Sequence, residues 1–165
     1  MAEIYVLLGD ADWGKSSTIK EIYRMLSIAN NNIAKNYPND NYPIAKDGYD
    51  IKAEVVAKKK ATQESVLVGI ESHGDPVPKN NKYQRLKNSL DDFAKSGCEK
   101  IFCAERIKIP PGILVVSQIV AQWAVANNSK KGSKPYTVVP ILQTARNNGQ
   151  YYNAAKEIIQ MAGLE

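Results

Sequence analysis

The sequence is poor in the residues that usually build metal centres. It contains one histidine, His73, and two cysteines, Cys98 and Cys103. A C-x4-C spacing without further cysteine or histidine ligands is not the pattern of a structural zinc site. We therefore expect both cysteines to be reduced thiols inside the core.

The sequence also lacks an apolar run of eighteen residues, so it predicts no transmembrane helix. The first residues, Met-Ala-Glu-Ile-Tyr, lead directly into a strand without a basic region or a cleavage site, and we expect a cytoplasmic protein with no membrane partner. With 165 residues, of which 44% are hydrophobic and 24% charged, the composition is that of one globular domain spanning 1–165.

Arginine is scarce, with four residues against 18 lysines, and the net charge is +5. A lysine excess of this size usually covers a solvated surface, although it also favours a polyanion. The densest group, lysines 58–60, falls at an expected turn without aromatic neighbours. Nucleic acid is therefore a weaker expectation than a small-molecule or protein partner.

Apolar strand-like runs alternate with amphipathic segments along the chain. We expect strands at 3–8, 51–57, 65–71, 100–105 and 136–142, and helices at 15–28, 80–96, 113–126 and 150–162. The segment 30–50 has no period and is expected to be a long surface connection. This order predicts an α/β fold, a three-layer α/β/α sandwich with a mostly parallel five-stranded sheet and room for one antiparallel edge strand.

Residues 9–16, GDADWGKS, match the pattern G-x-x-x-x-G-K-[ST] between an expected strand and an expected helix. Glycines let the main chain turn tightly and bring its N–H groups close to a phosphate. The helix that follows directs the positive end of its dipole to the same place. Lys15 would supply a cation for the phosphates, and the Ser16 hydroxyl would supply an oxygen ligand for Mg²⁺.

This stretch resembles the Walker A motif of P-loop nucleoside triphosphatases and kinases, and the overall pattern is similar to small ATP-binding P-loop proteins of bacteria and phages. The resemblance implies a P-loop fold that binds ATP with Mg²⁺. The nucleotide would be held by nine consecutive residues: Gly9, Asp10, Ala11, Asp12, Trp13, Gly14, Lys15, Ser16 and Ser17. The side chains of Asp10 and Asp12 are expected to face outward, toward solvent, a metal ion, a substrate or a partner.

A second acidic site is expected in residues 66–76, VLVGIESHGDP, where an apolar strand ends in an acid. The pattern resembles the Walker B motif, in which the acid holds Mg²⁺ through water, and its E-x-x-G spacing is similar to the D-x-x-G switch segment of GTPases. Glu71 and Asp75 are equal candidates to bind the metal or orient a water molecule. Ser72 is a candidate to contact phosphate, and His73 is either a base or ordinary polar surface.

Two arginines follow expected strands. Arg106 comes after 100–105, where its guanidinium would neutralise charge on a transferred phosphoryl group. Arg146 comes after 136–142 and has no assigned role. The expected catalytic set is Lys15, Glu71, Asp75 and Arg106.

The sequence lacks the N-K-x-D tetrapeptide of guanine-specific GTPases, so ATP is expected rather than GTP. The favoured hypothesis is a Mg²⁺-dependent ATPase or a small phosphotransferase (kinase) with an unidentified acceptor. The alternative is a nucleotide-dependent switch with slow hydrolysis and a protein partner. A third and weaker hypothesis is a polyanion-binding domain.

Overall fold

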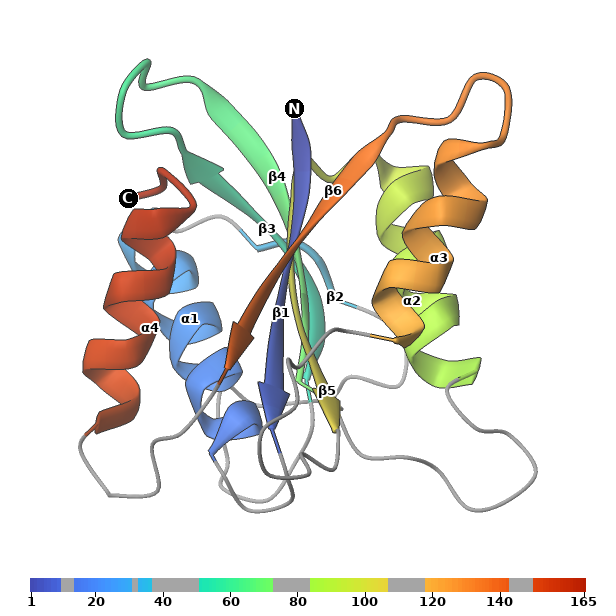
Figure 1. Ribbon diagram of the computed structural model, residues 1–165. Coiled ribbons are helices and arrows are strands. Elements are labelled where there is room, and N and C mark those ends of the chain that lie inside the picture. The colour runs from blue at the N-terminus through green and yellow to red at the C-terminus, as the bar shows by residue number, and fades with distance from the viewer. Residues whose placement is uncertain (10–13, 31–32, 37–50, 73–83, 107–117, 143–149) are drawn as a thin grey trace.

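The computed structural model describes residues 1–9, 14–30, 33–36, 51–72, 84–106, 118–142 and 150–165 (Figure 1). The described strands are β1 (Ala2–Gly9), β2 (Ile33–Asn36), β3 (Lys52–Lys58), β4 (Ser65–Glu71), β5 (Lys100–Arg106) and β6 (Tyr136–Leu142). The described helices are α1 (Lys15–Asn30), α2 (Gln84–Ser96), α3 (Ile119–Asn128) and α4 (Gln150–Met161).

These six strands form one sheet in the order β2-β3-β4-β5-β1-β6. Neighbouring strands from β4 to β6 are parallel, whereas β3 is antiparallel to both β2 and β4. The carboxyl ends of β4, β5, β1 and β6 therefore lie at the same edge of the sheet. In open sheets of this kind, ligands bind beyond that edge.

The helices cover the two faces of the sheet in pairs, with α1 and α4 on one face and α2 and α3 on the other (Figure 1). Successive residues of a strand point to opposite faces, so β1 contributes Tyr5 and Leu7 to the core under α1 and α4, and Ile4 and Val6 to the core under α2 and α3. The expected three-layer α/β arrangement is confirmed. Within the described residues, no helix combines the length and the apolar character needed to cross a bilayer.

Helix α2 packs unusually close to β4 because a glycine lies beneath it. A Cβ atom added at Gly69 would lie 2.5 Å from the Phe93 ring, which is fully buried. This close approach brings Ser89 of α2 to the end of β4, next to Glu71.

The structure differs from the expected one in two places. Strand β2 lies within the segment 30–50, for which no strand was expected, so the sheet has six described strands rather than five and β2 is the antiparallel strand at its edge. Strand β2 has only four residues, and its register with β3 is irregular, so it has too few alternating side chains to produce a pattern. Helix α3 begins at Ile119 and ends at Asn128 rather than spanning 113–126, and residues 113–117 lie outside the described ranges.

Candidate phosphate-binding site

The candidate site begins where β1 ends. Strand β1 lies inside the sheet between β5 and β6 and is buried from Ile4 to Gly9, and α1 begins at Lys15. Between them, Gly14 has a φ of +80°, a left-handed conformation that glycine adopts without steric cost. The Gly14 carbonyl accepts the N–H of Thr18 at 2.9 Å, so Gly14 is the residue that starts the helix.

The first turn of α1 carries the cation and the hydroxyl that the motif requires. Lys15 is 5% exposed, so its side chain is enclosed by protein. The N–H groups of a first helical turn have no partner within the helix and carry a partial positive charge. Lys15 and these N–H groups together make the start of α1 favourable for a multiply charged anion.

Ser16 connects this turn to the end of β4. Its hydroxyl donates a hydrogen bond of 2.9 Å to the carbonyl of Ser72, which is fully buried. The Ser72 N–H donates to the Ile51 carbonyl at 2.9 Å, and the Ile51 N–H donates to the Ser72 hydroxyl at 2.7 Å. Because the Ser16 proton is donated to a carbonyl, the lone pairs of its oxygen are directed elsewhere, as a metal ligand requires.

Glu71, an expected metal ligand, is fully buried and accepts the Ser89 hydroxyl at 2.6 Å. Strand β5 lies between β4 and β1, so neighbouring-strand spacing puts the β4 backbone about 10 Å from that of β1. The Glu71 carboxylate is directed toward α2, the layer opposite α1. The structure thus brings the Ser72 carbonyl, and not the Glu71 carboxylate, to the Ser16 hydroxyl.

Glu105, which was not among the expected site residues, is the last residue but one of β5 and, like Glu71, follows a buried apolar run. It pairs in register with Leu8 and is 1% exposed. Its carboxylate accepts the N–H groups of Gln118 and Ile119 at 3.0 Å and of Val120 at 3.4 Å. Glu105 therefore caps α3, whose own N-cap residue forms no side-chain hydrogen bond.

The thiol of Cys103 lies on the same face of β5 as Glu105. Burial, together with the charges of Glu105 and Glu71, raises its pKa well above the ordinary thiol value. The thiol therefore stays protonated and is a poor nucleophile or metal ligand. Cys98 and Cys103 are both buried and neither forms a disulfide, which confirms the expectation of reduced core thiols.

Arg106 is the last residue of β5 and pairs in register with Gly9. Parallel neighbours in a sheet are about 4.8 Å apart, so its backbone lies beside the first glycine of the motif. The other expected or open candidates lie outside the described residues: Asp10, Ala11, Asp12, Trp13, His73, Asp75 and Arg146.

No group of three or more histidine, cysteine or acidic side chains that could hold a metal ion is present among the described residues. Of the two expected metal ligands that the structure describes, Ser16 and Glu71, Ser16 is the one whose oxygen lies at the start of α1. A Mg²⁺ ion here would take its remaining ligands from phosphate oxygens and water, which is how this ion usually binds in nucleotide sites.

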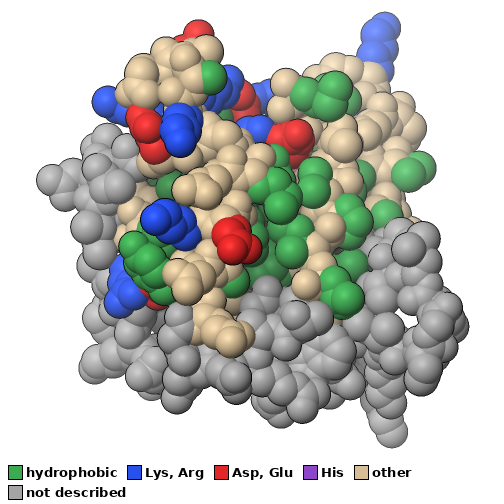
Figure 2. Space-filling view, turned by 60° about the vertical axis from the view of Figure 1, so that its left-hand side comes forward, with side chains coloured by type: hydrophobic (Ala, Val, Ile, Leu, Met, Phe, Trp, Pro, Cys, Tyr) green, Lys and Arg blue, Asp and Glu red, His purple; other side chains and the backbone are tan. Residues whose placement is uncertain are grey.

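The lysines do not form a continuous basic surface on the face of the molecule that Figure 2 shows. Within the run 58–60, the Lys59 ammonium lies 2.9 Å from the Glu99 carboxylate and 3.8 Å from that of Glu64. Figure 2 shows basic and acidic side chains interspersed on one face, with hydrophobic side chains between them. This arrangement gives no specific support to a polyanion-binding surface on that face.

Comparisons with protein-family models, curated proteins and solved structures gave no match for this chain. The interpretation of the site therefore depends on its own geometry and on the motif in its sequence.

Proposed function

We propose that this protein binds the Mg²⁺ complex of a nucleoside triphosphate, ATP, at the carboxyl end of β1 and transfers or hydrolyses its terminal phosphoryl group. The observation that carries the proposal is the succession along the chain of a buried interior parallel strand, a left-handed Gly14 and a helix that begins with a buried Lys15. This combination suits a phosphate group because amide N–H groups, a helix dipole and an ammonium meet there.

Three residues near the start of α1 and the end of β5 have defined parts in this proposal. Lys15 would neutralise charge on the outer phosphates. The Ser16 oxygen would bind Mg²⁺ while its hydroxyl proton stays hydrogen-bonded to the Ser72 carbonyl. Arg106, placed beside Gly9 by the strand register, would face the charge that develops on the transferred group.

The position of β1 in the sheet also supports the proposal. Strand β1 lies between β5 and β6, two strands that follow it much later in the chain. The chain leaves β1 toward one edge of the sheet and leaves its neighbour β5 toward the other, and the helices α1 and α3 that follow these two strands cover opposite faces (Figure 1). Ligand crevices in open α/β sheets form at such points.

The proposal is tested by calorimetric titration of ATP, GTP and inorganic triphosphate with and without Mg²⁺. We expect ATP to bind with Mg²⁺ and Lys15→Ala to weaken its affinity by about tenfold to a hundredfold, because charge-assisted hydrogen bonds to phosphate are lost. Lys20→Ala, one turn further along α1, is the matched control and should leave the affinity unchanged. Absence of triphosphate binding by the unmodified protein would refute the proposal.

A nucleotide-dependent switch is the second candidate, and one observation favours it. Ser72 connects Ser16 to Ile51 through hydrogen bonds, so the site is coupled to the start of β3. Turnover assays distinguish the two functions. Slow, acceptor-independent hydrolysis that a protein partner accelerates supports the switch, whereas turnover that depends on a small acceptor supports a phosphotransferase.

A further inference from the structure

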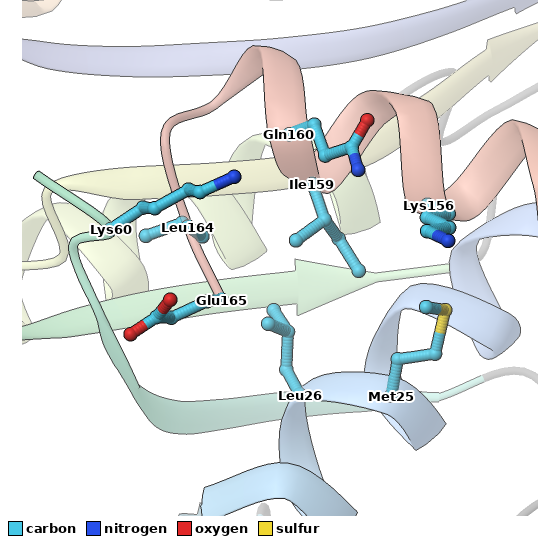
Figure 3. Close-up of a pocket in the computed structure, with 8 residues that line it drawn as sticks. All are labelled: Met25, Leu26, Lys60, Lys156, Ile159, Gln160, Leu164 and Glu165. Carbon is cyan, nitrogen blue, oxygen red and sulfur yellow. The ribbon is translucent and has the colours of Figure 1, made fainter.

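A second candidate site lies in a hollow between α1, α4 and the residues that follow α4 (Figure 3). Its volume is about 220 Å³. Its floor is apolar, because Leu26, Ile159 and Leu164 are buried side chains and Met25 is partly buried. Its rim is polar and is formed by Lys60, Lys156, Gln160 and Glu165.

The wall formed by the last residues is held in place by the main chain. The Lys60 N–H donates to the Gly163 carbonyl at 2.8 Å, and the Glu165 N–H donates to the Lys58 carbonyl at 3.1 Å. Leu164 forms a bridge with Lys59 between these two bonds. The walls of the hollow are therefore fixed by regular structure, namely α1, α4 and the turn between β3 and β4.

The side chains of the rim have a net positive charge, because two lysines lie there with one glutamate. Neither the Lys60 nor the Lys156 ammonium has an ion-pair partner among the described residues, and both side chains are exposed. The Glu165 carboxylate accepts a hydrogen bond from the Gln63 amide. In Figure 3, Lys60 and Lys156 stand on opposite sides of the apolar floor, so an anionic group at either side would meet a lysine.

We propose that this hollow binds a small amphiphilic anion, an unbranched carboxylate of about eight carbons. An apolar cavity of about 150 Å³ accommodates benzene, so about 220 Å³ suits a slightly longer chain. The alkyl chain contacts the apolar floor, with Met25 adjusting to its shape, and the carboxylate pairs with Lys60 or Lys156. The hollow is distinct from the phosphate site, because Leu26 lies about 16 Å along α1 from Lys15, and the inference does not depend on the proposed function.

The test is a calorimetric titration with octanoate below its micellar range, compared with octanol as the neutral probe of similar length. We expect saturable binding of one octanoate and an affinity for octanol that is about threefold to tenfold lower, because the ion pair is missing. The double variant Lys60→Gln/Lys156→Gln should lower octanoate affinity to the octanol level. Lys95→Gln, on α2 in the opposite layer, is the matched control and should change nothing.

A second variant tests the apolar floor. Met25→Gln keeps the size of a partly buried side chain and should weaken the binding of both probes, with its fold checked by circular dichroism. The inference is overturned if octanoate fails to bind, if octanol binds equally well, or if amide shifts in the titration map away from α1 and α4. A dimer in sedimentation that Met25→Gln dissociates would also overturn it, because the hollow would then be covered by a second copy.

Discussion

The ends of β4 and β5 differ in structure although their sequences are alike. In each strand a buried apolar run is followed by a glutamate, Glu71 as the last residue of β4 and Glu105 as the last but one of β5, and both are almost completely buried. Glu71 accepts a side-chain hydroxyl from α2, whereas Glu105 accepts three main-chain N–H groups from α3. An acid at the end of a buried strand is therefore not by itself a metal ligand, because the donors around it determine its role.

The difference arises from the helix that each strand faces. Helix α3 starts near the end of β5 without a capping side chain of its own, so its first N–H groups need an acceptor. Helix α2 lies along β4 instead, brought close by Gly69, and presents the side chain of Ser89 to Glu71. Glu105 fixes where α3 begins, and Glu71 joins the middle of α2 to the sheet.

Removing the Glu105 carboxylate at the end of β5 should lower the stability of the protein more than the other substitutions considered below. In Glu105→Ala, three N–H groups at the start of α3 lose their acceptor, and we expect the free energy of unfolding in urea to fall by about 3 kcal/mol. Glu105→Gln retains one acceptor oxygen and should lose about half as much. Hydrogen exchange should show the loss of protection at Ile119 and Val120, and a fall of less than about 1 kcal/mol for the alanine variant would contradict this role.

The second largest effect is expected at the β4 end, from the residue after the acid. Ser72→Ala leaves the buried Ile51 N–H without its hydroxyl acceptor and should destabilise the protein by about 2 kcal/mol. It should also weaken Mg²⁺ affinity in the presence of ATP by about tenfold, because groups that orient a metal ligand have effects of this size. ATP affinity measured without Mg²⁺ should stay the same.

Ser72→Thr is the control for this variant, since it keeps the hydroxyl and should restore both stability and Mg²⁺ dependence. If Ser72→Ala lowers stability alone, the Ser72 hydroxyl has no part in holding the carbonyl that contacts Ser16.

The sequence was sufficient to predict those parts of the structure that depend on local or periodic contacts. Ile19, Ile22 and Leu26 recur at helical spacing, and they form the buried face of α1. The glycine before the lysine was expected to allow a tight turn, and Gly14 has the left-handed φ of such a turn. The fold class followed from the alternation of strands and helices.

Contacts between distant residues could not be predicted in the same way. Ser16 and Ser72 are 56 positions apart, and their hydrogen bond uses a main-chain carbonyl that any residue would supply. Glu105 caps a helix that starts at Ile119, and no motif joins an acid to a helix at that spacing. The one available signal was that Glu105 ends an apolar run just as Glu71 does.

Removal of the Ser89 hydroxyl, which donates to Glu71, should lower the stability of the protein by a smaller amount. Ser89→Ala removes one donor from the buried carboxylate and should lower the free energy of unfolding by about 1 kcal/mol. The same variant distinguishes two roles for Glu71. If the acid only joins β4 to α2, Mg²⁺ affinity in the presence of ATP should not change, whereas a severalfold change would mean that Glu71 also orients a metal-bound water molecule.

The smallest effect is expected at the opposite end of β5, where the acid next to the strand lies near solvent. The Lys59 ammonium lowers the pKa of Glu99 by hydrogen bonding to its carboxylate, against a smaller effect of burial. A lowered pKa in the folded state means that the pair stabilises the protein above the ordinary glutamate pKa and stops doing so as the pH falls through the lowered value. Glu99→Gln should therefore lower Tm by about one or two degrees at neutral pH, since exposed pairs contribute little. Thermal unfolding from pH 7 to pH 3 should show this difference vanish at the acidic end, and a difference that persisted there would mean that packing rather than charge connects Glu99 to Lys59.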